Sequence, residues 1–212
     1  RQGEHYYHFG GVSPLNALNR EIIDHLEVEL KKRGHNLPVY FGNRNWHPFA
    51  SETAEKMSQD GVRKVAVFAT SAWGGYSACR QYDEDIQRMR EHLAEQGLPD
   101  IEFTKIRQFF DHPKFVAEMA AAVTEVWGQV PEEKKESTRL LFTAHSVPVA
   151  HDNVGGAEGD KNLYSRQVAE ASRLVAARAG ISDYDLVWQS RSGNPRTPCL
   201  LYTSDAADER SS

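Results

Sequence analysis

The stretch RLLFTAHSVP, residues 139–148, decides how the rest of the chain is interpreted. It begins as an apolar, strand-like run and ends on His145, which lies among small residues with Pro148 just beyond. In an open α/β sheet, ligands bind at the edge formed by the carboxyl ends of the strands. Two interpretations of His145 stay open on this evidence: an ordinary loop or core histidine, or a functional residue at the end of a buried strand.

Apolar periodicity on both sides of this strand predicts alternating strands and helices. The strands are expected at residues 37–42, 63–71, 101–109, 139–144 and 184–190. The helices are expected at residues 15–33, 50–61, 79–96, 112–130 (opened by Pro113) and 162–179. Alternation of this kind predicts the α/β class, with a parallel sheet and helices on both of its faces.

Composition excludes several classes of partner and location. The 212 residues carry a net charge of −5 and no basic run, so nucleic acid is not an expected partner. No apolar run reaches the roughly 18 residues that a membrane helix needs. Two cysteines cannot build a disulfide framework, so a cytoplasmic location is expected.

Three further loops carry residue types that suit a flat ligand with acid groups. Ser13 stands just ahead of the first helix, where a simple capping role explains it equally well. Arg44 and Trp46 follow the predicted strand at 37–42, and an arginine there can clamp a carboxylate or merely be exposed. Tyr76 and Tyr82 follow the strand at 63–71, where they can contact a ligand or pack the helix onto the sheet.

Five blocks of this sequence together resemble the ferrochelatase family: HFGGVSPLNALN (8–19), LPVYFGNRNWHP (37–48), FATSAWGGYSACRQY (68–82), LLFTAHSVP (140–148) and WQSRSGNPRTP (188–198). The likeness is collinear over residues 4–198 and is strongest to the actinobacterial, coproporphyrin-type members. It implies insertion of Fe²⁺ into a porphyrin during haem synthesis. It also implies two Rossmann-like halves without a nucleotide site, with the porphyrin in the cleft between them.

A polar stretch, PEEKKEST (131–138), is the candidate boundary between two halves of the chain, and the resemblance says what these halves are. It implies an α/β fold of two Rossmann-like, chelatase-type parallel-sheet halves, the second of them truncated. Residues 1–130 are expected to form the first half without its opening strand, and residues 131–198 the start of the second half. Residues 199–212 match nothing in the family, so we expect them to be a non-native tail without a partner in the fold.

Site residues follow from the same resemblance. His145 matches the histidine that faces the centre of the macrocycle, where it is expected to act as a base, as the Fe²⁺ ligand, or as both. An imidazole suits either role, because it accepts protons near neutral pH and binds ferrous iron. Ser13 and Tyr82 match porphyrin-binding positions, and Arg44 and Tyr76 are further candidates from the same cleft wall.

Cys79 matches a position that ligates a [2Fe–2S] cluster in some members of the family. One thiolate cannot hold a cluster, so a cluster is expected only in a full-length protein, and Cys79 is expected to be inert in this chain. No resident cofactor is required, and Fe²⁺ enters as a substrate. The family's second-half glutamate, opposite the histidine, has no counterpart here, so we expect this chain to be an inactive, incomplete copy.

Coproporphyrin III is the expected substrate, with ferrous iron as the second partner and a monomer as the expected state. Three alternatives stay open: protoporphyrin IX as the substrate, a porphyrin- or metal-binding module without turnover, and a cobalt or sirohydrochlorin chelatase of similar fold. The blocks GGVSP and CRQY argue against the last of these. Composition does not decide among the others.

Overall fold

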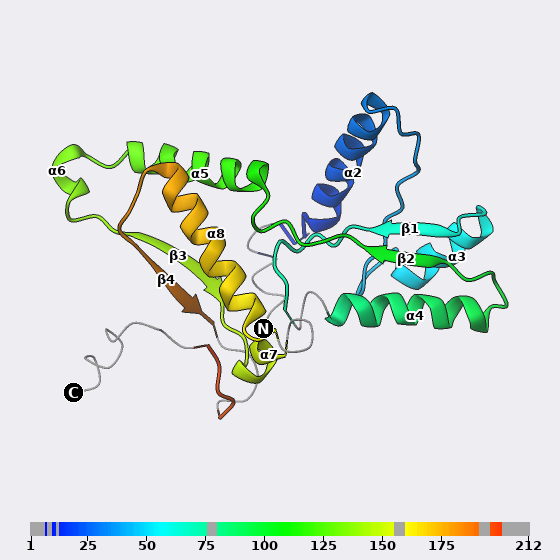
Figure 1. Ribbon diagram of the computed structural model, residues 1–212. Helices are drawn as coiled ribbons and strands as arrows, with labels where there is room; N and C mark the ends of the chain where they lie inside the picture. Colours follow the sequence, from blue (N-terminus) through cyan, green and yellow to red (C-terminus); the bar gives the residue numbers. More distant parts are fainter. Residues whose placement is uncertain are drawn as a thin grey trace. The chain divides into compact units, whose positions relative to one another are not determined.

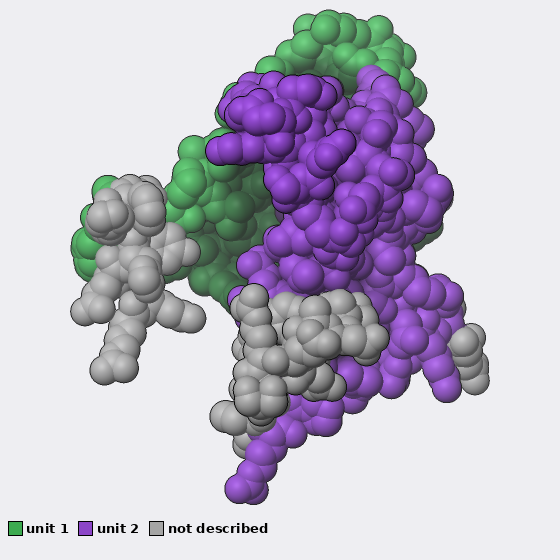
Figure 2. Space-filling view, turned by 90° about the vertical axis from the view of Figure 1, so that its left-hand side faces the viewer, with its two compact units in different colours: residues 1–63, 88–102 green, residues 64–87, 103–212 purple. Residues whose placement is uncertain are grey.

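A computed structural model describes residues 7, 10–11, 13–75, 80–154, 160–190 and 196–200 of the chain. The fold is mixed α/β, with helices and short strands following one another along the chain (Figure 1). The chain divides into two compact units, coloured separately in Figure 2. Unit 1 comprises residues 1–63 and 88–102, and unit 2 comprises residues 64–87 and 103–212.

Unit 1 contains helices α2 (Leu15–Lys32) and α3 (Ala50–Gln59) and the second part of α4 (Gln81–Glu95). Gly34 follows α2 with a φ of 81°, a left-handed conformation that glycine adopts without strain and that ends helices, as predicted. The fully buried side chains of this unit lie elsewhere, at Ala54 on α3, at Leu93 on α4 and at Ile101. The core of unit 1 therefore forms between α3 and α4.

The strand predicted at 37–42 is wrong, because the structure has no strand there. The residues of this run suit a strand, but a strand also needs a hydrogen-bonded neighbour. Among the described residues, the Phe41 carbonyl instead accepts a hydrogen bond of 2.8 Å from the hydroxyl of Thr53 on α3. Residues 37–42 are therefore bonded to helix α3 rather than to a neighbouring strand.

In the described part of the chain, four short strands form two sheets of two strands each. β1 (Lys64–Val67) pairs with β2 (Glu102–Lys105), and β3 (Leu140–His145) pairs in parallel with β4 (Tyr184–Gln189). The register of the second sheet runs from Leu140 opposite Tyr184 to His145 opposite Gln189. Parallel pairing of strands far apart in sequence confirms the predicted α/β class.

Burial on both faces was expected for these strands, and the structure corrects that expectation. Along β1, exposed and half-buried residues alternate, and they do so along β3 as well. Phe142 of β3 packs on the core of unit 2, whereas Leu141 is 53% exposed. Since successive side chains of a strand point to opposite faces, His145 lies on the same face as Leu141 and Thr143, the exposed one.

Helices α5 (Pro113–Gly128) and α8 (Leu163–Ala179) pack on the other face of this sheet, and Figure 1 shows α8 running along β3 and β4. Their shared core includes Val116 and Ala120 of α5 and Val175 of α8. Pro113 is the first residue of α5, as predicted, because its fixed φ and missing N–H suit the first helical turn. The helix predicted at 162–179 is confirmed.

Two short helices complete the description. α6 (Glu132–Lys135) lies within the polar stretch before β3, and α7 (Val149–Asn153) follows the Pro148 turn after β3. Neither was predicted, because runs of four or five residues carry no measurable periodicity. Of the helices that the structure describes, none combines the length and apolarity that a bilayer crossing requires.

Candidate functional site

His145 is the last residue of β3 and is exposed to solvent. Its Nδ1 atom lies 2.7 Å from the backbone carbonyl oxygen of Ser146. The structure therefore confirms the predicted position of this histidine, at the carboxyl end of a strand in a parallel sheet. It also adds a local contact that restricts rotation of the ring.

The peptide group that joins His145 to Ser146 is held at both of its polar ends. Its carbonyl oxygen accepts a hydrogen bond of 3.0 Å from the hydroxyl of Tyr164, and its N–H donates to the Gln189 carbonyl at 2.8 Å. Ser146 is only 1% exposed, and its hydroxyl donates to the carbonyl of Leu200. Hydrogen bonds with Tyr164, Gln189 and Leu200 therefore hold the backbone at His145 and Ser146 in place.

The segment after His145 pairs with residues near position 200. Pro148 forms an antiparallel bridge with Cys199, and the Leu200 N–H donates to the Val147 carbonyl at 2.8 Å. Cys199 is buried. The expectation that residues from 199 onward lack a partner is therefore wrong for Cys199 and Leu200, while residues 201–212 lie outside the described part of the chain.

Asp152 on α7 supports the helix that carries Tyr164, and the sequence did not reveal this role. It is 2% exposed, and its carboxylate accepts hydrogen bonds from the Ser165 N–H at 3.1 Å and from the Ser165 hydroxyl at 2.6 Å. The residue that precedes α8, Asn162, makes no capping bond with its side chain. Asp152 therefore caps α8 from another helix, and its pairing with Ser165 leaves no signal at helical or strand spacing.

A pocket of about 490 Å³ opens in unit 2, which is an ordinary size for a small-molecule site. Its lining consists of Thr70, Ser71, Ala72, Trp73, Tyr82, Phe109 and Phe115. The ring of Phe115 meets those of Trp73 and Phe109 edge to face, at centroid distances of 6.2 and 5.3 Å. Hydroxyl groups and flat apolar rings share this wall, which suits a planar ligand with polar edges.

The glycine turn after Trp73 packs closely on the first turn of α8. A Cβ at Gly74 would lie 2.8 Å from Leu163, and one at Gly75 would lie 3.1 Å from the Cβ of Tyr164. Gly75 also has a φ of 127°, which side-chain-bearing residues rarely adopt. At Gly75 both the backbone conformation and the close approach of Tyr164 favour glycine, and the helical turn that contacts His145 therefore packs on the residues that follow Trp73.

Tyr164 takes part both in the hydrogen bond to the His145 carbonyl and in the packing on Gly75. Its ring lies 5.8 Å from that of the buried Trp188, between centroids. Burial raises the pKa of the Tyr164 hydroxyl, and the Asp152 carboxylate raises it further. The phenol therefore stays protonated at neutral pH and able to donate its hydrogen bond.

The remaining candidates with described positions, Ser13 and Arg44, belong to unit 1 and are exposed. The Ser13 hydroxyl lies 3.4 Å from the Leu15 N–H, but Pro14 occupies the capping position of α2 and no side chain caps the helix. The Ser13 hydroxyl nevertheless accepts a hydrogen bond from the first N–H of α2, so a local role at this helix end still explains Ser13. Tyr76 and Cys79 lie outside the described residues.

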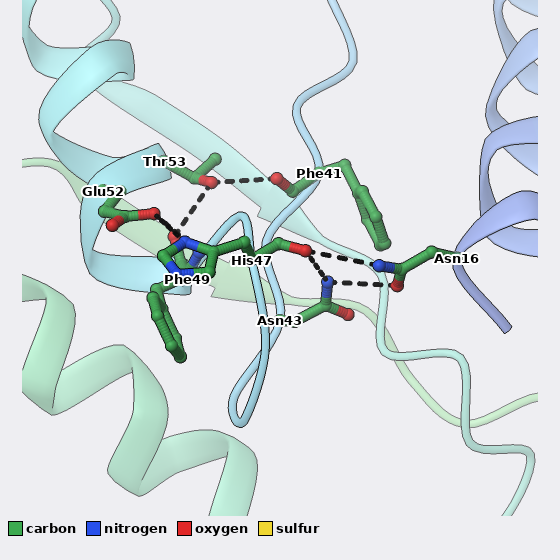
Figure 3. A network of polar contacts seen from close by, with 7 residues as sticks. All are labelled: Asn16, Phe41, Asn43, His47, Phe49, Glu52 and Thr53. Carbon is green, nitrogen blue, oxygen red and sulfur yellow. Dashed lines mark hydrogen bonds and ion pairs between the residues drawn. The ribbon is translucent and has the colours of Figure 1, made fainter. Parts of the chain in front are cut away.

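A polar network holds the loop that carries Arg44 (Figure 3). The side-chain amides of Asn16 and Asn43 donate to the His47 carbonyl at 3.3 and 3.2 Å, and the His47–Pro48 peptide is cis. Glu52 accepts from the Phe49 N–H at 3.0 Å, and this bond, with a smaller effect of His47, holds the pKa of the carboxyl below its usual value. The network ties the Arg44 loop to the first turn of α2, next to Ser13.

The structure thus places His145 and Tyr82 in unit 2 and Ser13 and Arg44 in unit 1. Within the described ranges, no group of three or more His, Cys, Asp or Glu side chains is arranged to hold a metal ion. What unit 2 offers is a fixed imidazole at a sheet edge and a separate aromatic pocket, both supported by the first turn of α8.

Comparisons with known proteins show which sequences this chain is similar to. A sequence profile described as Ferrochelatase matches residues 1–200. The coproporphyrin III ferrochelatase of Corynebacterium glutamicum is 60% identical over 92% of this chain and 53% of its own length. That of Corynebacterium diphtheriae is 59% identical over 92% and 55%, and that of Mycolicibacterium smegmatis 55% identical over 93% and 56%. The chain spans about half the length of these relatives.

Proposed function

Because this chain belongs to the ferrochelatase family, we propose that the full protein inserts Fe²⁺ into coproporphyrin III in haem biosynthesis. The observation that carries the proposal is the 55–60% identity, over more than nine tenths of this chain, to enzymes named for that porphyrin. The matched residues 1–200 include the strand that ends on His145. The whole activity belongs to a protein of about twice this length.

His145 is the residue to which we assign the chemistry. Metallation removes two pyrrole N–H protons, and a neutral imidazole is a suitable acceptor near neutral pH. Imidazole nitrogen is also a good ligand for Fe²⁺, which enters as a substrate and leaves bound to the product. The exposed position of His145 at the sheet edge supports either role.

Four residues are proposed to contact the porphyrin: Ser13, Arg44, Tyr76 and Tyr82. Tyr82 lines the aromatic pocket, where its hydroxyl can donate to a propionate while the rings contact the macrocycle. Ser13 and Arg44 supply a hydroxyl and a guanidinium for propionates, and Tyr76 joins them by its match to the family block. In this proposal residues 1–130 and 131–198 form the two halves of the cleft, and the tail that is not native to it begins after Leu200.

No resident cofactor is proposed for this chain. A [2Fe–2S] cluster that includes Cys79 would need further thiolates from the part of the protein that these 212 residues do not include. We propose a cytoplasmic monomer whose partners are the porphyrin and ferrous iron, without a role for nucleic acid. The acidic net charge of −5 supports the last point.

The test is metal insertion by the purified full-length protein. Coproporphyrin III and protoporphyrin IX are each offered with Fe²⁺ under anaerobic conditions, and the loss of free-porphyrin fluorescence is followed. We expect a larger kcat/KM for coproporphyrin III. A preference for protoporphyrin IX would overturn the substrate, and tight binding of either porphyrin without metallation would identify a binding module instead.

A further inference from the structure

The contact between His145 and Ser146 determines which ring nitrogen carries the proton. Nδ1 lies 2.7 Å from the Ser146 carbonyl oxygen, and a peptide carbonyl can only accept a hydrogen bond. Nδ1 must therefore be the protonated nitrogen in this contact. In the neutral ring, Nε2 then keeps its lone pair. Within the described part of the chain, no hydrogen bond to Nε2 is found.

This contact depends on the orientation of the Ser146 carbonyl, and Tyr164 acts directly on the backbone that sets it. The hydroxyl of Tyr164 donates to the His145 carbonyl, while the N–H of the same peptide group donates to Gln189. With both polar groups bonded, this peptide plane cannot rotate without breaking a hydrogen bond. The Ser146 carbonyl that meets Nδ1 belongs to the next peptide group, so Tyr164 and Gln189 hold one of the two peptide planes that flank Ser146.

Tyr164 is itself held firmly. Its neighbour Ser165 is bonded twice by the buried carboxylate of Asp152, and its ring packs beside Trp188. Its Cβ lies in the space that glycine leaves at position 75, on the turn that follows Trp73. One side chain thus connects the histidine to the loop that lines the pocket.

We propose that Tyr164 is a positioning residue that holds His145 with its proton on Nδ1 and presents Nε2 as the reacting atom. The assignment of chemistry to Nε2 rests on the proposed function, whereas the position of the proton does not. When Nε2 takes a pyrrole proton, the imidazolium carries N–H groups at both nitrogens. The Nδ1–H bond to Ser146 persists, so the ring does not have to reorient during the transfer.

The position of the proton can be measured on the full-length protein, with or without activity. Long-range ¹H–¹⁵N correlation spectra of histidine-labelled protein distinguish the two neutral tautomers, and the His145→Gln variant identifies the signals of this residue. At a pH where the ring is neutral, we expect His145 to carry its proton on Nδ1. A proton on Nε2 in the unmodified chain would overturn the inference without reference to any variant.

The role of Tyr164 is tested by Tyr164→Phe, which removes the hydroxyl and keeps the ring beside Trp188. We expect this variant to show a mixture of both tautomers. The matched control is Tyr184→Phe, because Tyr184 lies at the opposite end of the same sheet and packs on Phe142. The control should keep the single tautomer, and a single Nδ1–H tautomer in Tyr164→Phe would contradict the positioning role.

A second readout uses the full-length protein, where Tyr164→Phe should lower kcat for metal insertion about ten- to hundredfold with little change in KM. If Tyr164→Phe shows the expected mixture of tautomers but an unchanged kcat, Tyr164 has no role in catalysis. If the unmodified full-length protein inserts no metal, the proposed function fails while the tautomer measurement stands. The two failures are therefore distinguishable.

Discussion

At the scale of single residues, His145 combines an exposed side chain with a backbone that is held by hydrogen bonds. Its place at a strand end could be predicted from the apolar run before it and the small residues around it. Its partners could not, because Tyr164 and Gln189 come from segments 19 and 44 residues further along the chain. Contacts of this kind depend on tertiary packing, which local patterns do not encode.

Tyr82 and Ser13 should contribute to binding rather than to catalysis. In the full-length protein, Tyr82→Phe should weaken coproporphyrin III affinity by about 0.5–1.5 kcal/mol, since one hydrogen bond has about that net value. Ser13→Ala should have an effect of similar size. Affinity is measured by quenching of protein fluorescence on titration with the porphyrin. If both variants bind as tightly as the unmodified protein, the proposed contacts are wrong.

At the scale of elements, the helices of this chain were more predictable than its strands. The helices from Ala50, Gln81, Pro113 and Leu163 lie where the 3.6-residue period placed them. The run at 37–42 looked equally strand-like but lacks a neighbour to pair with, and the apolar run in β3 did not reveal that only one face is covered. Strand formation and burial depend on distant partners, whereas a helix closes its own hydrogen bonds.

Asp152 should contribute more to stability than its place in a short helix suggests. Asp152→Ala removes a buried carboxylate that accepts two hydrogen bonds from Ser165, so the free energy of unfolding should fall by about 1–3 kcal/mol. The control is Asp183→Ala, because the side chain of Asp183 is 77% exposed. This substitution should change the free energy of unfolding by less than about 0.5 kcal/mol. Urea unfolding of the full-length protein measures both, and equal effects would contradict the capping role.

The ion pairs at the start of β3 and β4 should make this sheet sensitive to acid. Arg139 bonds Asp185 and Asp183, and its guanidinium holds the pKa of Asp185 below the usual value. A depressed pKa stabilises the folded state above the unfolded pKa, and that contribution is lost as the pH falls through the folded pKa. The stability difference between the unmodified chain and Arg139→Met should therefore be largest near neutral pH and vanish in acid.

Salt provides the check on this prediction. The groups are exposed, so screening should shrink the difference measured at neutral pH in thermal unfolding. A difference that persists unchanged in acid or in high salt would show that Arg139 acts through packing of its alkyl chain rather than through its charge.

At the scale of the whole molecule, apolar side chains remain exposed in both units. Leu15, Leu18 and Ile22 form one side of α2 and are 59%, 51% and 48% exposed, and Leu141 is exposed on the open face of β3. Surfaces of this kind favour association, as do sheet edges without a neighbour. They belong to a chain that spans about half the length of its relatives.

The isolated 212-residue chain should therefore associate with itself, bind hydrophobic dyes and melt with low cooperativity. It should also be inactive in metal insertion, and removal of residues 199–212 should not restore activity. Light scattering, dye fluorescence and the zinc-insertion assay measure these properties. Iron or zinc insertion by the purified chain would contradict the prediction and would show that the histidine side of the cleft suffices.

The most direct measurement of the central claim is a single-turnover metallation assay of the full-length protein and its His145→Ala variant, with Fe²⁺ and coproporphyrin III in the absence of oxygen. We expect the unmodified protein to form the iron porphyrin. His145→Ala should bind the porphyrin with nearly unchanged affinity and form no product, while His151→Ala, which alters an exposed histidine of α7, should behave normally. Near-normal product formation by His145→Ala would contradict the account.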